Sequence, residues 1–181
     1  MDEGDRRRIR SECIGLLREV GCDEAVVEHC IAVAELALEI AFHHNHSEGH
    51  DSVDENLVFK GALLHDIGRA RSHGVEHGFM GGEVARELGL EEKVVIIIQR
   101  HVGAGITAEE AKEVGLPPVD FIPETMEEKI VAHADNLMDG WRRTSIEHAI
   151  ANLKGKLGEA HPSINRMMRL HEEVMGKSGK P

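Results

Sequence analysis

The stretch FKGALLHDIGRA, residues 59–70, places two polar side chains, His65 and Asp66, at the end of an apolar run. Apolar residues at helical spacing predict a buried helix over residues 56–67, ended by Gly68. Burying an imidazole beside a carboxylate costs free energy unless both groups are hydrogen-bonded or bound to a cation. The pair therefore predicts a charged ligand at the end of this helix.

The same helical spacing recurs along most of the chain. The 181 residues are enough for one domain, and 41% hydrophobic with 30% charged residues is typical of a globular protein. Aromatic residues make up only 3%, so the core must be aliphatic, which suits helix packing. We expect one all-α domain over residues 1–181, a compact helical bundle with its core over about 22–141 and closing helices over 144–176.

Several segments carry the local signals of helices. Residues 94–98 are β-branched and fit a buried strand on composition alone, but their charged flanks favour a helix. Capping-box spacing predicts helix starts at Thr107 and Thr125, with a break at the two prolines between them. Further helices are expected over residues 23–42, 78–88, 91–101, 145–157 and 163–175.

The charge balance limits the classes of partner. The formal net charge is −12, with 33 acidic against 21 basic residues, which argues against binding to duplex nucleic acid. A small phosphorylated substrate at a locally positive site remains compatible with this charge. The first ten residues lack the apolar centre of a signal peptide, and no aliphatic run is long enough to span a membrane. We expect a cytoplasmic protein, with the oligomeric state open.

The three cysteines, Cys13, Cys22 and Cys30, have no zinc-type pair spacing. Their odd number does not indicate a disulfide framework. We expect buried, reduced thiols.

A histidine-rich stretch, HHNHSEGHDSVD, follows Phe42 and contains His43, His44, His46 and His50. One interpretation is a metal site. The other, which we favour, is an exposed loop between helices, because metal sites need ligands that are held rigidly by their neighbours.

Other histidines and acids stand on apolar helices, where packing alone does not explain them. A carboxylate inside an apolar helix, such as Asp135, is costly unless it is paired or bound to a cation. Imidazole nitrogens and carboxylate oxygens together suit Mn, Fe, Co, Ni or Zn. The candidate ligands in this group are His29, His65, Asp66, His77, His101 and Asp135.

The order of His29, the His65-Asp66 pair and Asp135 resembles the HD-domain metal-dependent phosphohydrolases, with residues 65–68 in the form called HDIG. The resemblance covers residues from about 25 to 140 and extends to small stand-alone proteins, including archaeal ones. It implies a helical HD fold, a divalent transition metal and hydrolysis of a nucleotide or related phosphomonoester or phosphodiester by a metal-bound hydroxide.

The resemblance also implies individual roles. One ion would be held by His29, His65, Asp66 and Asp135, and Asp66 would bridge to a second ion held by His77 and His101. Alternatively, His77 is a capping residue and His101 is stabilised by the helix dipole.

Two arginines have competing interpretations. Arg69 would bind a substrate phosphate through its planar fork, or form a surface ion pair. Arg142 would share a helix face with Asp135 and reach the phosphate, or pair with Asp139, which we favour. His133 should point away from Asp135.

Two other functions fit the same residues. Some proteins of this fold hold two irons and activate oxygen, and others are non-catalytic ligand-binding modules. His101 is followed by Val102 rather than by a Gly-Tyr-Pro motif, which argues against cyclic dinucleotide hydrolysis of the HD-GYP kind.

Overall fold

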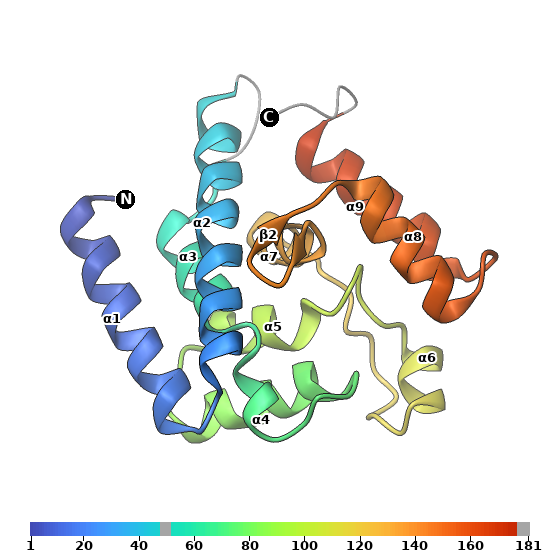
Figure 1. Ribbon diagram of the computed structural model, residues 1–181, viewed down its shortest axis with the longest axis horizontal. Coiled ribbons are helices and arrows are strands. Elements are labelled where there is room, and N and C mark those ends of the chain that lie inside the picture. The colour runs from blue at the N-terminus through green and yellow to red at the C-terminus, as the bar shows by residue number, and fades with distance from the viewer. Residues whose placement is uncertain (48–51, 177–181) are drawn as a thin grey trace.

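Helices form nearly all of the regular structure in the computed structural model, which describes residues 1–47 and 52–176 (Figure 1). The only strands in this part of the chain are two residues long and pair as an antiparallel hairpin. The predicted all-α class is confirmed. The elements are α1 (Glu3–Glu19), α2 (Glu24–His46), α3 (Glu55–Leu64), the 3-10 helix η1 (Ile67–Ala70), α4 (His77–Glu87), α5 (Glu92–Arg100), α6 (Ala108–Glu113), α7 (Met126–Asn136), β1 (Met138–Asp139), β2 (Arg142–Arg143), α8 (Ile146–Leu157) and α9 (Pro162–Met175).

Short polar side chains start the helices at the predicted positions. Asp23, Thr107 and Thr125 each accept a hydrogen bond from the backbone N–H three residues on. Only Thr107 forms a complete capping box, with Glu110. At Thr125 the reciprocal half is absent, because the Glu128 carboxylate accepts from the backbone N–H of Glu124 and from Arg100 instead.

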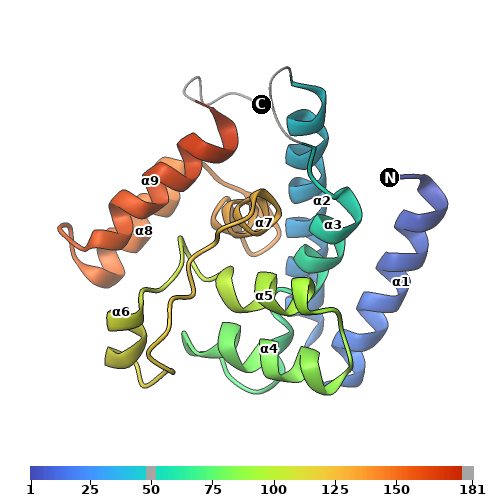
Figure 2. The ribbon, with the colours of Figure 1, turned by 180° about the vertical axis from the view of Figure 1, so that it is seen from behind.

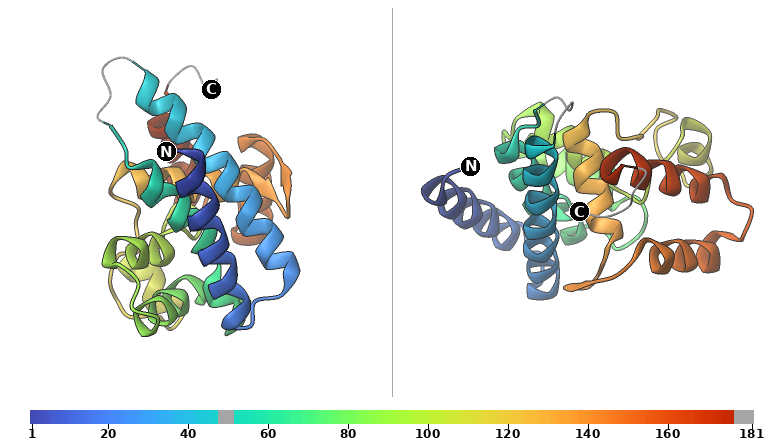
Figure 3. Two further views of the ribbon diagram at one scale, coloured as in Figure 1. Left: turned by 90° about the vertical axis from the view of Figure 1, so that its left-hand side faces the viewer. Right: turned by 90° about the horizontal axis from the view of Figure 1, so that it is seen from above.

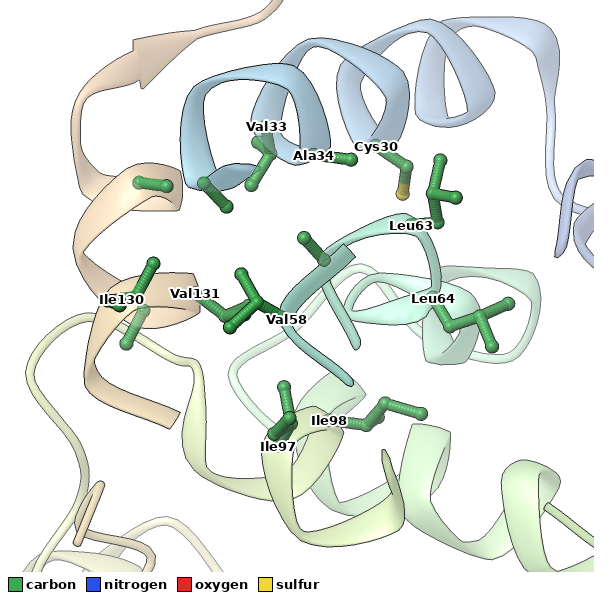
Figure 4. Packing of buried hydrophobic residues seen from close by; sticks show 14 of the residues in the cluster. Cys30, Val33, Ala34, Val58, Leu63, Leu64, Ile97, Ile98, Ile130 and Val131 are labelled. Atoms are coloured by element: carbon green, nitrogen blue, oxygen red, sulfur yellow. The ribbon is translucent and has the colours of Figure 1, made fainter. Parts of the chain in front are cut away.

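The core lies where α2, α3, α5 and α7 meet, and Figure 4 shows their apolar side chains facing one another. The β-branched run over residues 94–98 is helical, as predicted, and its residues 94, 95, 97 and 98 are buried. Burying each such side chain stabilises the fold by about 1.5–3 kcal/mol. The residues labelled in Figure 4 are Cys30, Val33, Ala34, Val58, Leu63, Leu64, Ile97, Ile98, Ile130 and Val131.

Helix α1 was not among the helices expected from the sequence. Its apolar residues Ile9, Cys13 and Leu17 recur every fourth position, are buried and join the main core. Asp2 caps the helix by accepting from the backbone N–H of Asp5. The helix packs against α2 and α3, as Figure 3 shows, so the core extends further towards the N-terminus than residue 22.

Helix α2 continues to His46, so the expectation of a loop after residue 42 is wrong for His43, His44 and His46. His44 is buried, whereas His43 and His46 are exposed. His46 donates from Nδ1 to the Phe42 carbonyl 2.7 Å away, so its ring is engaged within the last turn of α2. None of these three histidines belongs to a group of candidate metal ligands in residues 1–47 and 52–176, and His50 lies outside the described residues.

Helix α3 ends at Leu64, three residues earlier than expected, and η1 follows after His65 and Asp66. Gly68 lies so close to α4 that a Cβ atom there would be 2.0 Å from the His77 carbonyl oxygen and 2.6 Å from the Gly81 nitrogen. The bare glycine lets η1 pack directly on α4. This packing brings Asp66 next to His77.

A methyl group at residue 68 should therefore be strongly destabilising. We expect Gly68→Ala to lower the free energy of unfolding by about 3 kcal/mol, because it forces backbone against backbone. Gly155→Ala is the matched control, since nothing lies within 4 Å of a Cβ there and α8 should gain about 0.5–1 kcal/mol. Urea unfolding of both variants measures the difference, and equal effects would contradict the close packing.

Helix α7 ends at Asn136, and the chain then forms the β1–β2 hairpin, in which Gly140 adopts a φ of +59°. The expectation that Arg142 continues the helix face of Asp135 is therefore wrong. Arg142 is exposed on β2, opposite Asp139 in the backbone ladder, and no ion pair joins the two side chains. The hairpin instead leads the chain into α8 and α9.

Helices α8 and α9 pack on the far side of α7 from α2, as Figure 2 shows. His133 is buried between α7 and α9, with its Nε2 3.3 Å from His171 Nδ1, and it points away from Asp135 as expected. Burial, together with the neighbouring His171, lowers the pKa of His133 to about 3. The three cysteines are buried and unpaired with one another, as predicted. No helix in the described part of the chain combines the length and apolar character needed to cross a membrane.

Candidate metal centre

The histidines at residues 29, 65, 77 and 101 share one hydrogen-bonding pattern, in which Nδ1 contacts the main chain. In each ring, Nδ1 lies 2.7 Å from a backbone carbonyl oxygen. A carbonyl only accepts, so Nδ1 carries a proton, and in the neutral form of each ring Nε2 keeps its lone pair. The accepting carbonyls are those of Gly140, Ala62, Gly74 and Ile98, in the order of the histidines.

These Nε2 atoms face one another in two pairs. His29 and His65 approach to 3.2 Å, and His77 and His101 to 3.0 Å. When both rings of a pair are neutral, neither Nε2 atom can donate to the other, so the pair directs two lone pairs at one small space. A cation in that space would satisfy both nitrogens.

Asp66 lies between the two pairs and presents one oxygen to each. Its Oδ1 is 3.0 Å from His77 Nε2 and 3.5 Å from His101 Nε2. Its Oδ2 is 3.8 Å from the Nε2 atoms of both His29 and His65. The break between α3 and η1 makes this possible, because Asp66 leaves the helix there and points back across its end.

Asp135 completes the first pair. It stands one residue before the end of α7, not in the middle of the helix as expected. Its Oδ1 is 3.0 Å from His29 Nε2 and 3.5 Å from His65 Nε2. All six predicted ligands therefore lie together, in overlapping groups whose donor atoms are within 4.8 Å of one another.

The electrostatics of the cluster favour positive charge. Burial raises the pKa of Asp66 and of Asp135, but the facing histidines lower it by more, so both carboxyls stay ionised. Burial likewise lowers the pKa of His65, whereas Cys30, Asp66 and Asp135 raise it by more, and the net shift is well above its usual range. A buried site that stabilises added positive charge is chemically suited to a divalent cation.

The cluster opens on a cleft of about 760 Å³. Arg69 lies where the cluster meets the cleft. It donates from Nε to Asp66 Oδ1 at 3.1 Å and from Nη1 to the His73 carbonyl at 2.9 Å.

Two parts of the site could not be predicted from the sequence: the Gly140 carbonyl, which orients His29, and the side chains of α8 and α9 that line the cleft. Neither belongs to a recognisable motif.

The model of the HD domain family matches residues 26–138 of the chain. The uncharacterized protein MJ0778 of Methanocaldococcus jannaschii is 54% identical over 153 residues, which cover 84% of this chain and 89% of that protein. A tRNA (cytidine(56)-2'-O)-methyltransferase of Thermoplasma volcanium is 40% identical over 166 residues, or 91% of this chain. The chain spans only 47% of that methyltransferase.

Among solved structures, the fold is similar to the HD domain of the L. monocytogenes phosphodiesterase PgpH in complex with cyclic-di-AMP, with a TM-score of 0.51. The match covers 86% of this chain and 93% of that one at 17% identity, which establishes a common fold. The family match includes the segments that carry all six clustered side chains. The chain belongs to the HD-domain family.

Proposed function

We propose that this protein is a phosphohydrolase that depends on a pair of divalent transition-metal ions. His29, His65, Asp66 and Asp135 would hold one ion, and Asp66, His77 and His101 would hold a second. The observation that carries the proposal is the pair of facing Nε2 couples on either side of Asp66, at 3.2 and 3.0 Å. Cap and dipole roles for His77 and His101 explain neither the approach of their Nε2 atoms nor the contact of both with Asp66.

The donor set suits Mn, Fe, Co, Ni or Zn. Such ions supply Lewis acidity, since they lower the pKa of bound water and neutralise the charge on a phosphoryl group in an in-line displacement. The protein supplies rigidity. Each imidazole is fixed by a backbone carbonyl, and Asp66 is fixed by Arg69.

Arg69 is positioned to bind the substrate phosphate. Its Nε and Nη1 groups are engaged by Asp66 and His73, whereas its Nη2 group makes no hydrogen bond within residues 1–47 and 52–176. The side chain is 27% exposed and lines the cleft. A phosphate oxygen beside the metal centre would accept from this free N–H group.

Replacing Arg69 by Lys should therefore impair hydrolysis while keeping the charge. We expect kcat/KM to fall about 10- to 100-fold, because a compact ammonium lacks the planar fork that reaches Asp66 through Nε and the phosphate through Nη2, and a hydrogen bond to a charged group contributes about 1.5–3 kcal/mol. Arg71→Lys is the matched control, since Arg71 pairs with the exposed Glu87. Similar losses in both variants would contradict the assignment of Arg69.

The substrate class we propose is a nucleotide or a related phosphomonoester or phosphodiester. Two observations support it: the chain belongs to the HD-domain family, and a protein of the same fold is named a phosphodiesterase and binds cyclic-di-AMP. The net charge of −12 favours a small substrate drawn to a local positive site over a long polyanion.

Hydrolysis assays with reconstituted protein test the proposal. Protein loaded with Mn, Fe, Co, Ni or Zn should hydrolyse p-nitrophenyl phosphate, bis-(p-nitrophenyl) phosphate or nucleoside monophosphates, and a chelator should abolish the activity. No hydrolysis with any of these ions would overturn the proposal. Oxygen-dependent loss of an organic substrate by the anaerobically prepared iron form would point to the oxygenase alternative instead.

A further inference from the structure

The cleft beside the metal centre is larger than a phosphate group needs. Its volume of about 760 Å³ falls within the range of roughly 300–1,000 Å³ found for pockets that hold a drug-sized ligand. One wall carries His29, His77, Asp135 and Arg69, and the facing wall comes largely from α8 and α9. These two helices begin after residue 138, where the HD family match ends, so the facing wall lies outside the matched region.

The rim of the cleft is apolar. Val75, Val114 and Leu157 line it and are 38%, 48% and 48% exposed, which places them among the most exposed large hydrophobic residues of the described chain. They come from three separate segments: the loop before α4, the end of α6 and the end of α8. Exposed apolar side chains gathered around one opening indicate a ligand that presents an apolar face to them.

The unpartnered polar groups on the facing wall are mainly hydrogen-bond donors. His161 Nδ1 accepts from the Ser163 backbone N–H at 3.3 Å and lies 2.7 Å from its hydroxyl, so the ring proton stands on Nε2. That Nε2–H group has no partner among the described residues. Lys156 also lines the cleft and forms no ion pair in this part of the chain.

Arg166 holds the facing wall in place. Its Nη2 group donates to Glu110 Oε2 at 2.5 Å and to the Gly105 carbonyl at 3.2 Å, which anchors α9 to α6. Glu110 Oε2 also accepts from the Thr107 N–H group, so this side of the cleft is fixed by contacts within the protein. Because the Nε atom of Arg166 is buried, it does not face the ligand.

We propose that the wall formed by α8 and α9 binds the nucleobase of a nucleoside phosphate whose phosphate lies at the metal centre. This inference rests on the proposed function and names the part of the substrate that this chain selects. A nucleobase offers flat apolar faces to the rim of Val75, Val114 and Leu157, and ring-nitrogen and carbonyl acceptors on its edge to His161 and Lys156. A second phosphate would also accept from these donors, but it would leave the apolar rim uncovered and would face Glu113, which lines the same cleft.

Binding of nucleosides that lack a phosphate tests the subsite without any metal or turnover. Calorimetric titration of the chelator-treated full chain with adenosine, guanosine, cytidine and uridine should give saturable binding of at least one. His161→Ser keeps an N-cap acceptor for α9 but removes the Nε2–H donor, and Lys156→Gln removes the cation. Each should weaken binding about tenfold, equivalent to ~1.4 kcal/mol. Lys154→Gln and His148→Ser are the matched controls on α8, since neither residue lines the cleft.

Kinetics supply the second readout. The ratio of kcat/KM for the preferred nucleoside monophosphate to kcat/KM for p-nitrophenyl phosphate should fall about tenfold in His161→Ser and Lys156→Gln, and should be unchanged in the controls. Equal losses on both substrates, or no losses, would overturn the subsite. Inorganic diphosphate that binds in place of nucleosides and is weakened by Lys156→Gln would show a second phosphate site and would also overturn it.

The two proposals fail in different ways. Hydrolysis of p-nitrophenyl phosphate without any nucleoside binding leaves the phosphohydrolase standing and overturns the subsite. Nucleoside binding that depends on His161 and Lys156, in a protein that hydrolyses nothing, supports the subsite and overturns the phosphohydrolase.

Discussion

Replacing Asp66 by Asn should lower kcat/KM by at least about 10³-fold, equivalent to ~4 kcal/mol of transition-state stabilisation. The reason is geometric. Asp66 presents Oδ1 to His77 and His101 and Oδ2 to His29 and His65. An asparagine has one oxygen and one NH₂ group, so whichever way it turns, it offers hydrogens to one pair of lone-pair nitrogens and excludes the cation there. The loss of the Asp66 carboxylate charge would also weaken cation binding at the other site.

Asp139→Asn is the matched control for this prediction. Asp139 is an exposed aspartate on β1, close in sequence to Asp135 but outside the cluster. The kcat/KM of the Asp139→Asn variant should stay within about twofold of the wild-type value, since surface substitutions usually have small effects. Circular dichroism should show folded protein in both variants. An Asp66→Asn protein that keeps more than about a tenth of the wild-type activity would contradict the bridging role.

Divalent ions should stabilise the protein by a large margin. A free ion at 100 times its dissociation constant adds about 2.7 kcal/mol per site, and each kcal/mol raises the Tm of a chain of this size by about 2–4 °C. Two sites should therefore raise the Tm by roughly 10–20 °C above that of chelator-treated protein. The effect is expected because, without a cation, the cluster brings together two ionised carboxylates, that of Asp66 buried and that of Asp135 partly buried.

A single histidine variant separates the two sites. His101→Gln should remove the second ion and about half of the thermal stabilisation, because His101 Nε2 faces His77 and Asp66 Oδ1. His148→Gln, an exposed position on α8, should keep two bound ions. Differential scanning calorimetry together with elemental analysis measures both quantities. Equal ion content in the two variants would contradict a separate second site.

Much of the fold could be predicted because local physics dominates in helices. Apolar spacing and capping side chains placed most of the helices to within a few residues, including the β-branched run over residues 94–98. Helix α1 was missed because its charged residues obscured a narrow apolar stripe of Ile9, Cys13 and Leu17. The early end of α3 could not be foreseen, because it depends on the contact of Gly68 with α4, which no local pattern encodes.

The candidate metal centre could also be predicted only in part from the sequence. The six clustered side chains could be named from residue types and their order along the chain, and the structure brings all six together. Backbone carbonyl groups orient these side chains. His29, for example, is held by the carbonyl of Gly140, which lies beside it only in the folded chain. Arg142 was misplaced for the same reason, since the chain turns at Gly140 instead of continuing α7. The cleft wall from α8 and α9 depends entirely on tertiary packing.

We propose that imidazoles and carboxylates from five segments of the chain share divalent cations at one end of the cleft. Anomalous diffraction from crystals grown with Mn²⁺ tests this directly. We expect one anomalous peak within bonding distance of His29, His65, Asp66 and Asp135, and another beside Asp66, His77 and His101. An ordered cluster with no anomalous peak, in protein saturated with the ion, would contradict it.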